Sequence, residues 1–422
     1  MKYFLFLFFL LLLACQYYPL NLPVFLSTLA SMLIAIVFSL RNQKKQFSIT
    51  LLLLLFGLIS LGHHADLQYG LLEFNSEIYP VSIQDYLAVG VSFCFGYFTL
   101  GRNFKVSVNF IQIFACLSTV LISISFLRLQ SGEYPVYHNP NWSGKLMLSF
   151  MLLSINFIFQ GFATTFFWKK TGKKTYFNMA ILGGVTIAWC INLLLLLSTG
   201  SRSATIALFS FLIPSLTYNY LLLFRKIARK KLFLTTSISI LLTLFTVLVF
   251  AVRNSYFYNK LIARMGASYS PRAYIYNCYL DLFKENFFFG QGIGRTAQIC
   301  EERLLSSEMG QQGYPSGFPF VNHAHNFILQ IAADHGIVVL VIVTALLGLY
   351  IWQFCQFLAT VRLGQVNRLD GIVVHICLTV FAIGLASLFQ SAVYHVPFLQ
   401  IWMGLLIGTS SAYMRSRSLQ QA

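Results

Sequence analysis

Long apolar runs separated by short polar connections occupy most of the chain. A helix needs about 20 apolar residues to cross the hydrocarbon core of a bilayer. Runs that reach or approach this length lie at residues 3–15, 22–40, 47–63, 82–100, 106–127, 146–168, 175–198, 203–224, 232–251, 336–359, 371–390 and 397–414. The pattern therefore predicts an all-α, polytopic membrane protein with about twelve transmembrane helices.

The first of these runs is shorter than the others. It ends in Leu13-Ala14-Cys15, which resembles the end of a lipoprotein signal peptide with its acylated cysteine. A second apolar run follows at once, and this favours a short first membrane helix paired with the second.

One long segment, residues 252–325, interrupts the apolar pattern and is rich in Tyr, Phe and Gly. Long loops of this kind usually carry binding or catalytic groups. We therefore divide the chain into nine helices at 1–251, a large loop with an amphipathic helix and catalytic residues at 252–325, and three helices with a tail at 326–422. The charged residues of the loop are Arg253, Lys260, Arg264, Arg272, Asp281, Lys284, Glu285, Arg295, Glu301, Glu302, Arg303 and Glu308.

Composition agrees with a membrane protein. Hydrophobic residues make up 57% of the chain, charged residues make up 10%, and the mean hydropathy is +0.72, whereas a soluble domain carries about 25% charged residues. The net charge of +17 could indicate a nucleic-acid partner, but Lys and Arg lie in short clusters between apolar runs. That distribution is typical of membrane orientation signals. We therefore expect contact with membrane lipid and no nucleic acid.

The basic clusters predict the topology. Nineteen of the 29 Lys and Arg residues fall in connections on one side of the membrane, whereas short connections on the other side hold only Arg128, Lys145 and Arg202. Basic residues in short loops accumulate on the cytoplasmic side. Both termini are therefore predicted to be cytoplasmic, and the loop 252–325 is predicted to lie outside.

No cofactor is predicted. The sequence contains no Walker loop, no CxxC pair and no His/Cys cluster with metal-ligand spacing. Cys278 and Cys300 share the large loop, and a disulfide between them would require that this loop face an oxidising compartment. The sequence leaves that pairing open.

The first candidate site on the outer face is the segment Ser198-Thr199-Gly200-Ser201-Arg202-Ser203. It combines backbone N–H groups, hydroxyls and one guanidinium at a helix start, an arrangement that suits phosphate. The alternative is a simple turn whose arginine reaches the membrane–water interface.

The second candidate site begins at Pro271, a residue favoured in the first turn of a helix. Arg272 would lie in that turn and face the same boundary as Arg202, unless it pairs with an acid such as Asp281 or Glu285. The apolar face of this helix, predicted to lie against the membrane, consists of Tyr276, Tyr279, Leu280 and Phe283. The glycines that follow, Gly290, Gly292 and Gly294, form a GxGxG pattern, but no strand precedes it and a nucleotide site is not favoured.

The third candidate site, His323-Ala324-His325-Asn326, ends the large loop. Histidine can move protons near neutral pH, although a histidine at a helix start is more often a capping or hydrogen-bonded group. A zinc site would need a further ligand. The remaining candidates, which have no motif spacing, are His63, His64, His138 and His335.

Together these sites resemble the superfamily of O-antigen ligases and polymerases. These are polytopic glycosyltransferases of the bacterial inner membrane with a GT-C-like helical fold, and they use undecaprenyl-diphosphate-linked glycans as donors. The resemblance covers mainly residues 195–350. The matching pieces are Ser201-Arg202-Ser203-Ala204, Arg272 with Tyr276, residues 289–294, and His325 to Gln330 with Gly336-Ile337.

The resemblance implies a metal-independent transfer with inversion at the anomeric carbon. Arg202 and Arg272, with Ser201, would hold the donor diphosphate, and His325 would orient or deprotonate the acceptor hydroxyl. Residues expected to support the site are Asn326, Tyr276 and Arg295. The family pattern does not include the position of His323.

We expect an O-antigen ligase that transfers finished glycan to lipid A–core on the periplasmic face. A polymerase that joins lipid-linked repeat units to a growing glycan is the alternative within the superfamily. A transporter of the same lipid-linked glycans would need ionisable residues at mid-membrane depth, where Asp85, His375 and Asp334 are the candidates.

Overall fold

The computed structural model describes residues 83–100, 104–124, 140–167, 173–198, 201–224, 271–292, 295–306, 324–361, 368–388 and 397–419. Every regular element within these ranges is a helix, so the predicted all-α class is confirmed for this part of the chain. The predicted membrane runs that lie outside the described residues are 3–15, 22–40, 47–63 and 232–251.

The other eight predicted runs are long helices, most of them ending within a few residues of the expected bounds. They are α4 (Ile83–Cys94) with its π-helical continuation η1 (Phe95–Leu100), α5 (Phe104–Ile124), α7 (Pro140–Phe167), α8 (Lys173–Ser198), α9 (Arg202–Phe224), α15 (Phe327–Thr360), α16 (Arg368–Leu388) and α18 (Pro397–Leu419). In the described part of the chain, 5 of these helices, α5, α7, α8, α15 and α16, are long and apolar enough to cross a membrane.

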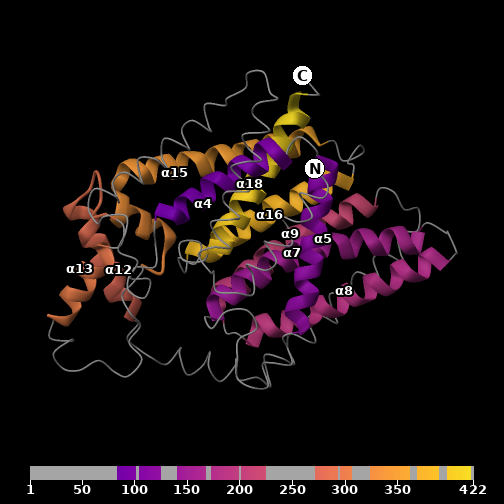
Figure 1. Cartoon of the computed structure of the whole chain (residues 1–422), viewed down its shortest axis with the longest axis horizontal. Helices are drawn as coiled ribbons and strands as arrows, with labels where there is room; N and C mark the ends of the chain where they lie inside the picture. The colour runs from indigo at the N-terminus through magenta and orange to yellow at the C-terminus, as the bar shows by residue number, and fades with distance from the viewer. Residues whose placement is uncertain are drawn as a thin grey trace.

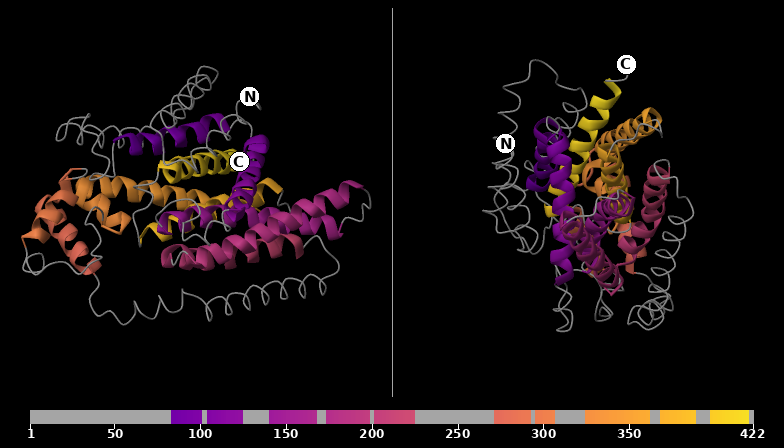
Figure 2. Two further views of the ribbon diagram at one scale, coloured as in Figure 1. Left: turned by 60° about the horizontal axis from the view of Figure 1, so that its bottom comes forward. Right: turned by 90° about the vertical axis from the view of Figure 1, so that its right-hand side faces the viewer.

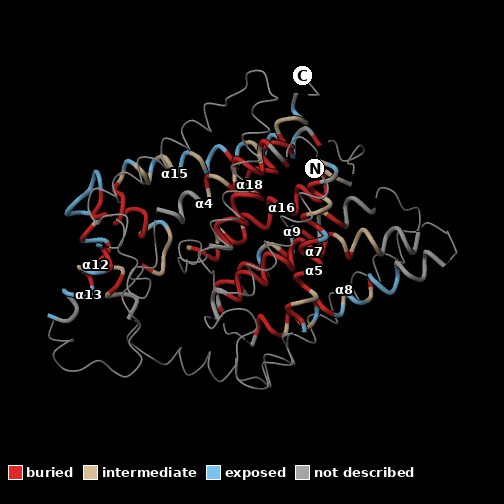
Figure 3. The backbone as a smooth tube through the Cα atoms, in the orientation of Figure 1, coloured by how far each residue is buried: buried red, intermediate tan, exposed pale blue. Residues whose placement is uncertain are grey.

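Two shorter helices, α12 (Pro271–Glu285) and α13 (Arg295–Leu305), come from the large loop. They lie together at one end of the bundle, beside the beginning of α15 (Figures 1 and 2). Buried residues are concentrated in the centre of the bundle, where α16, α18, α9, α7 and α5 meet (Figure 3). The helices of the large loop therefore lie apart from the main core.

Aromatic packing and a pair of glycines build the central contacts. The fully buried Trp402 ring lies 5.2 Å from the Phe114 ring and 5.8 Å from the Phe150 ring, measured between centroids. In α18, Gly404 and Gly408 face α4 so closely that an added Cβ would overlap atoms of α4. Small residues spaced by four allow helix backbones to approach closely inside a membrane.

Helix ends that the charge pattern places on one side of the membrane do meet in the structure. Near the start of α7, a Cβ added to Gly144 would lie 2.7 Å from the Cβ of Ser201, which precedes α9. At the opposite ends, the Arg417 guanidinium lies 3.5 Å from the Asp370 carboxylate. Two pairs of helix ends that the charge pattern places together therefore do meet, and the topology itself, with the identity of the cytoplasmic face, stays a prediction.

Candidate functional site

The helix α15 contains a break that divides it into two parts. It is 34 residues long, and Gly336 within it has φ 72° and ψ −174°. Residues 327–335 therefore form a short first helix, and residues 337–360 form a longer one of about 36 Å at 1.5 Å per residue. The sequence predicted a helix start beside His325 and Asn326 and a membrane-length apolar run from 336, but it did not predict the break at Gly336 that separates the two parts.

His325 and Asn326 have different roles at the start of α15. The Asn326 side chain caps the helix, accepting hydrogen bonds from the backbone N–H groups of Ile328 at 2.9 Å and Leu329 at 3.1 Å. His325 has φ 52°, the only positive φ of a non-glycine residue in the described ranges. This backbone conformation costs an L-residue about 1–2 kcal/mol, so the surrounding contacts must hold His325 in place.

A buried polar chain holds the backbone next to His325. The Ala324 N–H donates to Gln330 Oε1 at 2.7 Å, and Gln330 Nε2 donates to Asp334 Oδ2 at 2.7 Å. Tyr279 of α12 is fully buried against the same groups, and burial raises the pKa of its hydroxyl well above the ordinary value, with the Asp334 charge as a second cause. Gln330 therefore links the turn that carries His325 to the interior of the site.

The helix α12 begins at Pro271, as predicted, and Arg272 lies in its first turn. Its buried face differs from the predicted one by about one position. The buried residues are Ile275, Cys278, Tyr279 and Leu282, while Leu280 is 41% exposed and Tyr276 is half-buried. The predicted face assumed packing against the membrane, whereas the structure packs α12 against Ala333 of α15 and against Ala324, which precedes α15.

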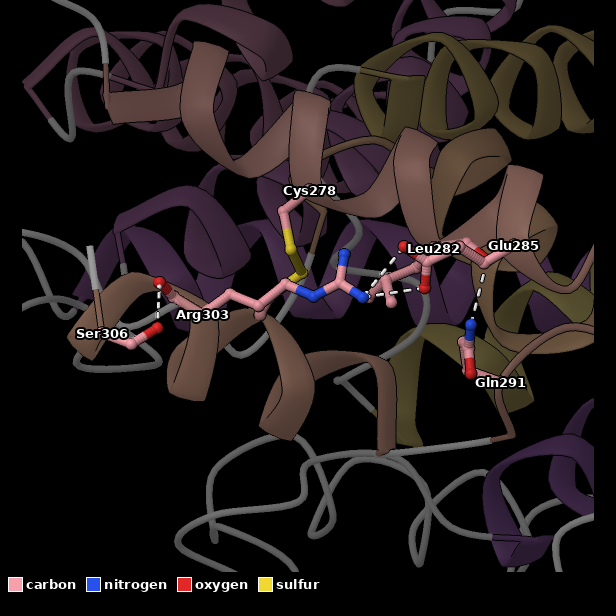
Figure 4. The surroundings of a disulfide bond; sticks show 7 residues. Cys278, Leu282, Glu285, Gln291, Arg303 and Ser306 are labelled. Carbon is pink, nitrogen blue, oxygen red and sulfur yellow. Dashed lines mark hydrogen bonds and ion pairs between the residues drawn. A yellow bond between two sulfur atoms is a disulfide. The ribbon is translucent and has the colours of Figure 1, made fainter.

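A disulfide and an ion pair join α12 to α13 (Figure 4). Cys278 and Cys300 form the disulfide, and the Arg303 guanidinium donates to both Glu285 oxygens, at 2.9 and 2.8 Å. Lys284 lies 3.1 Å from Asp281. Asp281 and Glu285 thus each contact a basic residue of this helix pair, and the role of Arg272 stays a prediction. Arg295 begins α13 with an exposed side chain.

The glycines after α12 have a structural explanation. Gly290 and Gly336 both have positive φ, and an added Cβ on either would overlap the backbone of the other segment. The Gln291 N–H donates to the Ala333 carbonyl at 2.9 Å, and the Gly292 N–H donates to the Asp334 carbonyl at 2.9 Å. Gly290 and Gly292 of the GxGxG pattern therefore take part in a close backbone crossing, whereas Gly294 lies outside the described residues.

The segment around Ser201 belongs to the main bundle. Ser201 is fully buried before α9, its carbonyl accepts from the Thr205 N–H at 3.0 Å, and Arg202 is the first residue of the helix. In the sequence, Lys145 is only one of the basic residues that predict membrane orientation. It is fully buried in α7, next to the Gly144 that contacts Ser201. Its burial results from helix packing, which the sequence pattern does not reveal.

The structure thus brings two predicted site segments onto one buried cluster. Arg272 precedes Ile275 by three residues, His325 follows Ala324, and both Ile275 and Ala324 belong to the cluster under α12. Ser201 lies beside the separate, larger cluster of the bundle. His323 lies outside the described residues.

Some of the candidate metal ligands and mid-membrane ionisable residues lie within the described ranges, whereas His63, His64 and His138 lie outside them. Among the described residues no group of three His, Cys, Asp or Glu side chains could hold a metal ion. His375 is enclosed in the bundle, where its Nε2 lies 2.9 Å from Asn219 Nδ2 and its Nδ1 lies 2.7 Å from the Gly371 carbonyl. This is the environment of a hydrogen-bonded structural histidine. Asp334 accepts from Gln330, and Asp85 lies in the first turn of α4.

Part of the chain is similar to a known protein family. Residues 186–344 match the family model described as O-Antigen ligase, and no curated protein matches the chain. The matched segment covers less than half of the chain but includes every predicted site residue, from Ser201 to Asn326. Residues 186–344, which include the candidate site, are thus similar to the O-antigen ligase family.

Proposed function

We propose that the protein is an O-antigen ligase of the bacterial inner membrane. It transfers a glycan from undecaprenyl diphosphate to a lipid A–core acceptor at the periplasmic face. The family match supports O-antigen ligase or polymerase-like activity, and the description of the family favours the ligase.

The observation that carries the proposal is the position of His325. Its backbone is held in a left-handed conformation at the start of α15, and its neighbour Ala324 packs in the same buried cluster as Ile275 of α12. Arg272 begins the same α12. A proton acceptor and a phosphate-binding cation are therefore attached to one rigid support, which suits a reaction that requires fixed geometry.

The proposed reaction is a direct displacement. Arg202 and Arg272, with Ser201, bind the donor diphosphate and stabilise the negative charge that develops as it leaves. The acceptor oxygen attacks the anomeric carbon, its proton passes to His325, and the bond from that carbon to the diphosphate oxygen breaks. Attack from the opposite face inverts the anomeric configuration. The diphosphate is itself the activated leaving group, so the step needs no nucleotide.

The disulfide supports the periplasmic placement of the site. Cys278 and Cys300 join the two helices that carry Arg272 and Arg295, and disulfides persist in oxidising compartments such as the bacterial periplasm. The charge bias of the short connections independently predicts the same side.

The test is a transfer assay with full-length protein in phospholipid vesicles. The donor is undecaprenyl-diphosphate-linked glycan with a labelled sugar, supplied with or without lipid A–core and with or without EDTA. The ligase proposal predicts that label moves to lipid A–core, requires that acceptor and is unaffected by EDTA.

Other products would contradict the proposal in distinct ways. Longer lipid-linked chains formed from donor alone would identify a polymerase. Loss of transfer with EDTA would overturn metal independence. Movement of intact donor across the vesicle membrane without any glycosidic bond change would identify a transporter.

A further inference from the structure

Three consecutive phenylalanines are exposed in the turn that follows α12. The exposed fractions are 43% for Phe287, 63% for Phe288 and 69% for Phe289. The rings of Phe283 and Phe287 lie 5.1 Å apart, and those of Phe287 and Phe288 lie 5.4 Å apart, so the turn presents a connected aromatic surface. Apolar surfaces of this kind mark contact with a membrane or another apolar partner. The proposed transfer reaction uses none of these side chains.

The turn is fixed to α15 by its backbone. The Ile337 N–H donates to the Phe287 carbonyl at 2.8 Å. The space that a Cβ of Gly336 would need is occupied by the Phe288 carbonyl and the Phe289 nitrogen. The aromatic turn is therefore held at a fixed position along the axis of α15, next to the break at Gly336.

The length of α15 and the predicted topology together indicate that this position lies at the outer boundary of the membrane. The whole of α15 has 34 residues and would measure about 51 Å, which exceeds the ~30 Å hydrocarbon core of a bilayer. Residues 337–360 alone, at about 36 Å, suffice to cross it. The short helix before Gly336 carries the buried polar side chains of Gln330 and Asp334, as expected outside the hydrocarbon. Ile337 is thus the first residue of the membrane-crossing part.

The aromatic turn continues the apolar face of that part. Val338 and Val341, which follow Ile337, are 45% and 57% exposed, and Trp352 further along is 62% exposed. The opposite side of the helix, with Tyr350, Phe354 and Phe357, is buried. In a membrane, acyl chains would cover the exposed side of residues 337–360. The aromatic turn lies at the end of this exposed side, so the same hydrocarbon is the apolar partner that can cover it.

We propose that the turn Phe287–Phe289 inserts among the acyl chains of outer-leaflet phospholipids and anchors the α12–α13 pair to the membrane surface. The anchor would hold Arg272 and His325 at the height where the diphosphate of a membrane-embedded carrier emerges. The placement of Arg272 and His325 near the carrier diphosphate rests on the proposed function, whereas insertion of the phenylalanine turn into the membrane does not.

The test measures depth and needs no catalysis. A nitroxide is attached to Phe288→Cys or, in a second protein, Phe289→Cys, in full-length chain that keeps only the Cys278–Cys300 pair among its native cysteines. The control is Ser306→Cys, an exposed site at the end of the pair away from Gln291 (Figure 4). Accessibility to oxygen, which concentrates in lipid, is compared with accessibility to a water-soluble nickel chelate in phosphatidylglycerol–phosphatidylethanolamine vesicles.

The anchor predicts that oxygen relaxes the labels at 288 and 289 more strongly than the nickel chelate does, with the opposite order at 306. Nickel accessibility at 288 and 289 equal to that at 306 would overturn it. Labels shielded from both reagents would mean that a protein surface, such as a second copy, covers the turn, and this too would overturn it. Because glycan transfer is not measured, failure of the anchor and failure of the ligase proposal are distinguishable.

Discussion

At the scale of single residues, the site combines groups that bind with groups that only position. Gln330 and Asn326 satisfy backbone N–H groups on either side of His325, and neither needs to touch a substrate. Arg303 is paired with Glu285, whereas Arg272 lies in a first helical turn. The two arginines of this helix pair therefore allow a matched comparison of a proposed phosphate-binding residue with a structural one.

Arg272→Ala is expected to abolish binding of the lipid-diphosphate donor while the protein still inserts and accumulates. Arg272→Lys should restore binding only in part, because an ammonium lacks the planar fork that matches phosphate oxygens. The measurement is retention of labelled donor by purified protein. In the control, Arg303→Ala should retain donor, since its half-exposed ion pair contributes only about 0–1 kcal/mol of stability. Equal donor loss in the two alanine variants would assign Arg272 a structural role.

The sequence predicted where these residues lie along the helices, but it did not predict which segments pack around them. The positions of Arg272 and His325 near helix starts followed from local signals, namely Pro271 and the end of a polar loop. The buried face of α12 did not, because its partner is α15, which lies far away in the sequence. The burial of Lys145 likewise depends on tertiary packing of α7 in the bundle.

At the scale of elements, the crossing of the Phe287–Gly292 turn over α15 determines the shape of the site. Gly290 and Gly336 provide the space for two backbones to touch. The sequence showed the glycines but not the contact, since the two lie 46 positions apart and belong to different elements. The membrane-helix pattern was predictable because each apolar run is a local property of the chain.

Gly336→Ala is expected to destabilise the protein by on the order of 1–3 kcal/mol, because its backbone conformation is strained for any residue with a Cβ. The Cβ would also overlap the Phe288 carbonyl. Gly348→Ala is the control in the same helix, since an added Cβ there meets nothing within 4 Å. Thermal unfolding in detergent should show a lowered midpoint for the first variant alone, and equal midpoints would contradict the crossing.

The disulfide should stabilise the α12–α13 pair. Its cysteines are separated by 22 positions, and closing a loop of this size contributes about 3 kcal/mol through the unfolded state. Protein with Cys278→Ser and Cys300→Ser should be cleaved faster within this pair under limited proteolysis, while Cys355→Ser, a change at an exposed free thiol, should not. Alkylation of Cys278 and Cys300 in native protein without reductant would show that the bond is absent.

At the scale of the whole molecule, the proposed reaction requires that Arg202, Arg272 and His325 lie on the same side of the membrane. The contact of Gly144 with Ser201 and the ion pair of Arg417 with Asp370 define two opposite ends. The α12–α13 pair lies beside the beginning of α15 (Figure 1). The charge bias then assigns the Arg417 end to the cytoplasm.

This assignment predicts the labelling of single cysteines in intact spheroplasts. With only the Cys278–Cys300 pair retained as background, a membrane-impermeant thiol reagent should label Ser306→Cys. It should label Lys105→Cys, at an exposed position near the start of α5, only after the membrane is opened. The reverse pattern would place the site in the cytoplasm and contradict the periplasmic reaction.

The central claim is that His325 accepts the acceptor proton while other residues hold the donor. The direct measurement is glycan transfer and donor binding by His325→Asn in phospholipid vesicles, because asparagine tolerates the left-handed backbone at this position but is no general base. We predict that transfer falls by ~10²–10⁴-fold, that donor binding stays close to that of the native protein, and that the Cys278–Cys300 bond still forms. Transfer near the native rate, or a loss of donor binding as large as the loss of transfer, would contradict the role of His325.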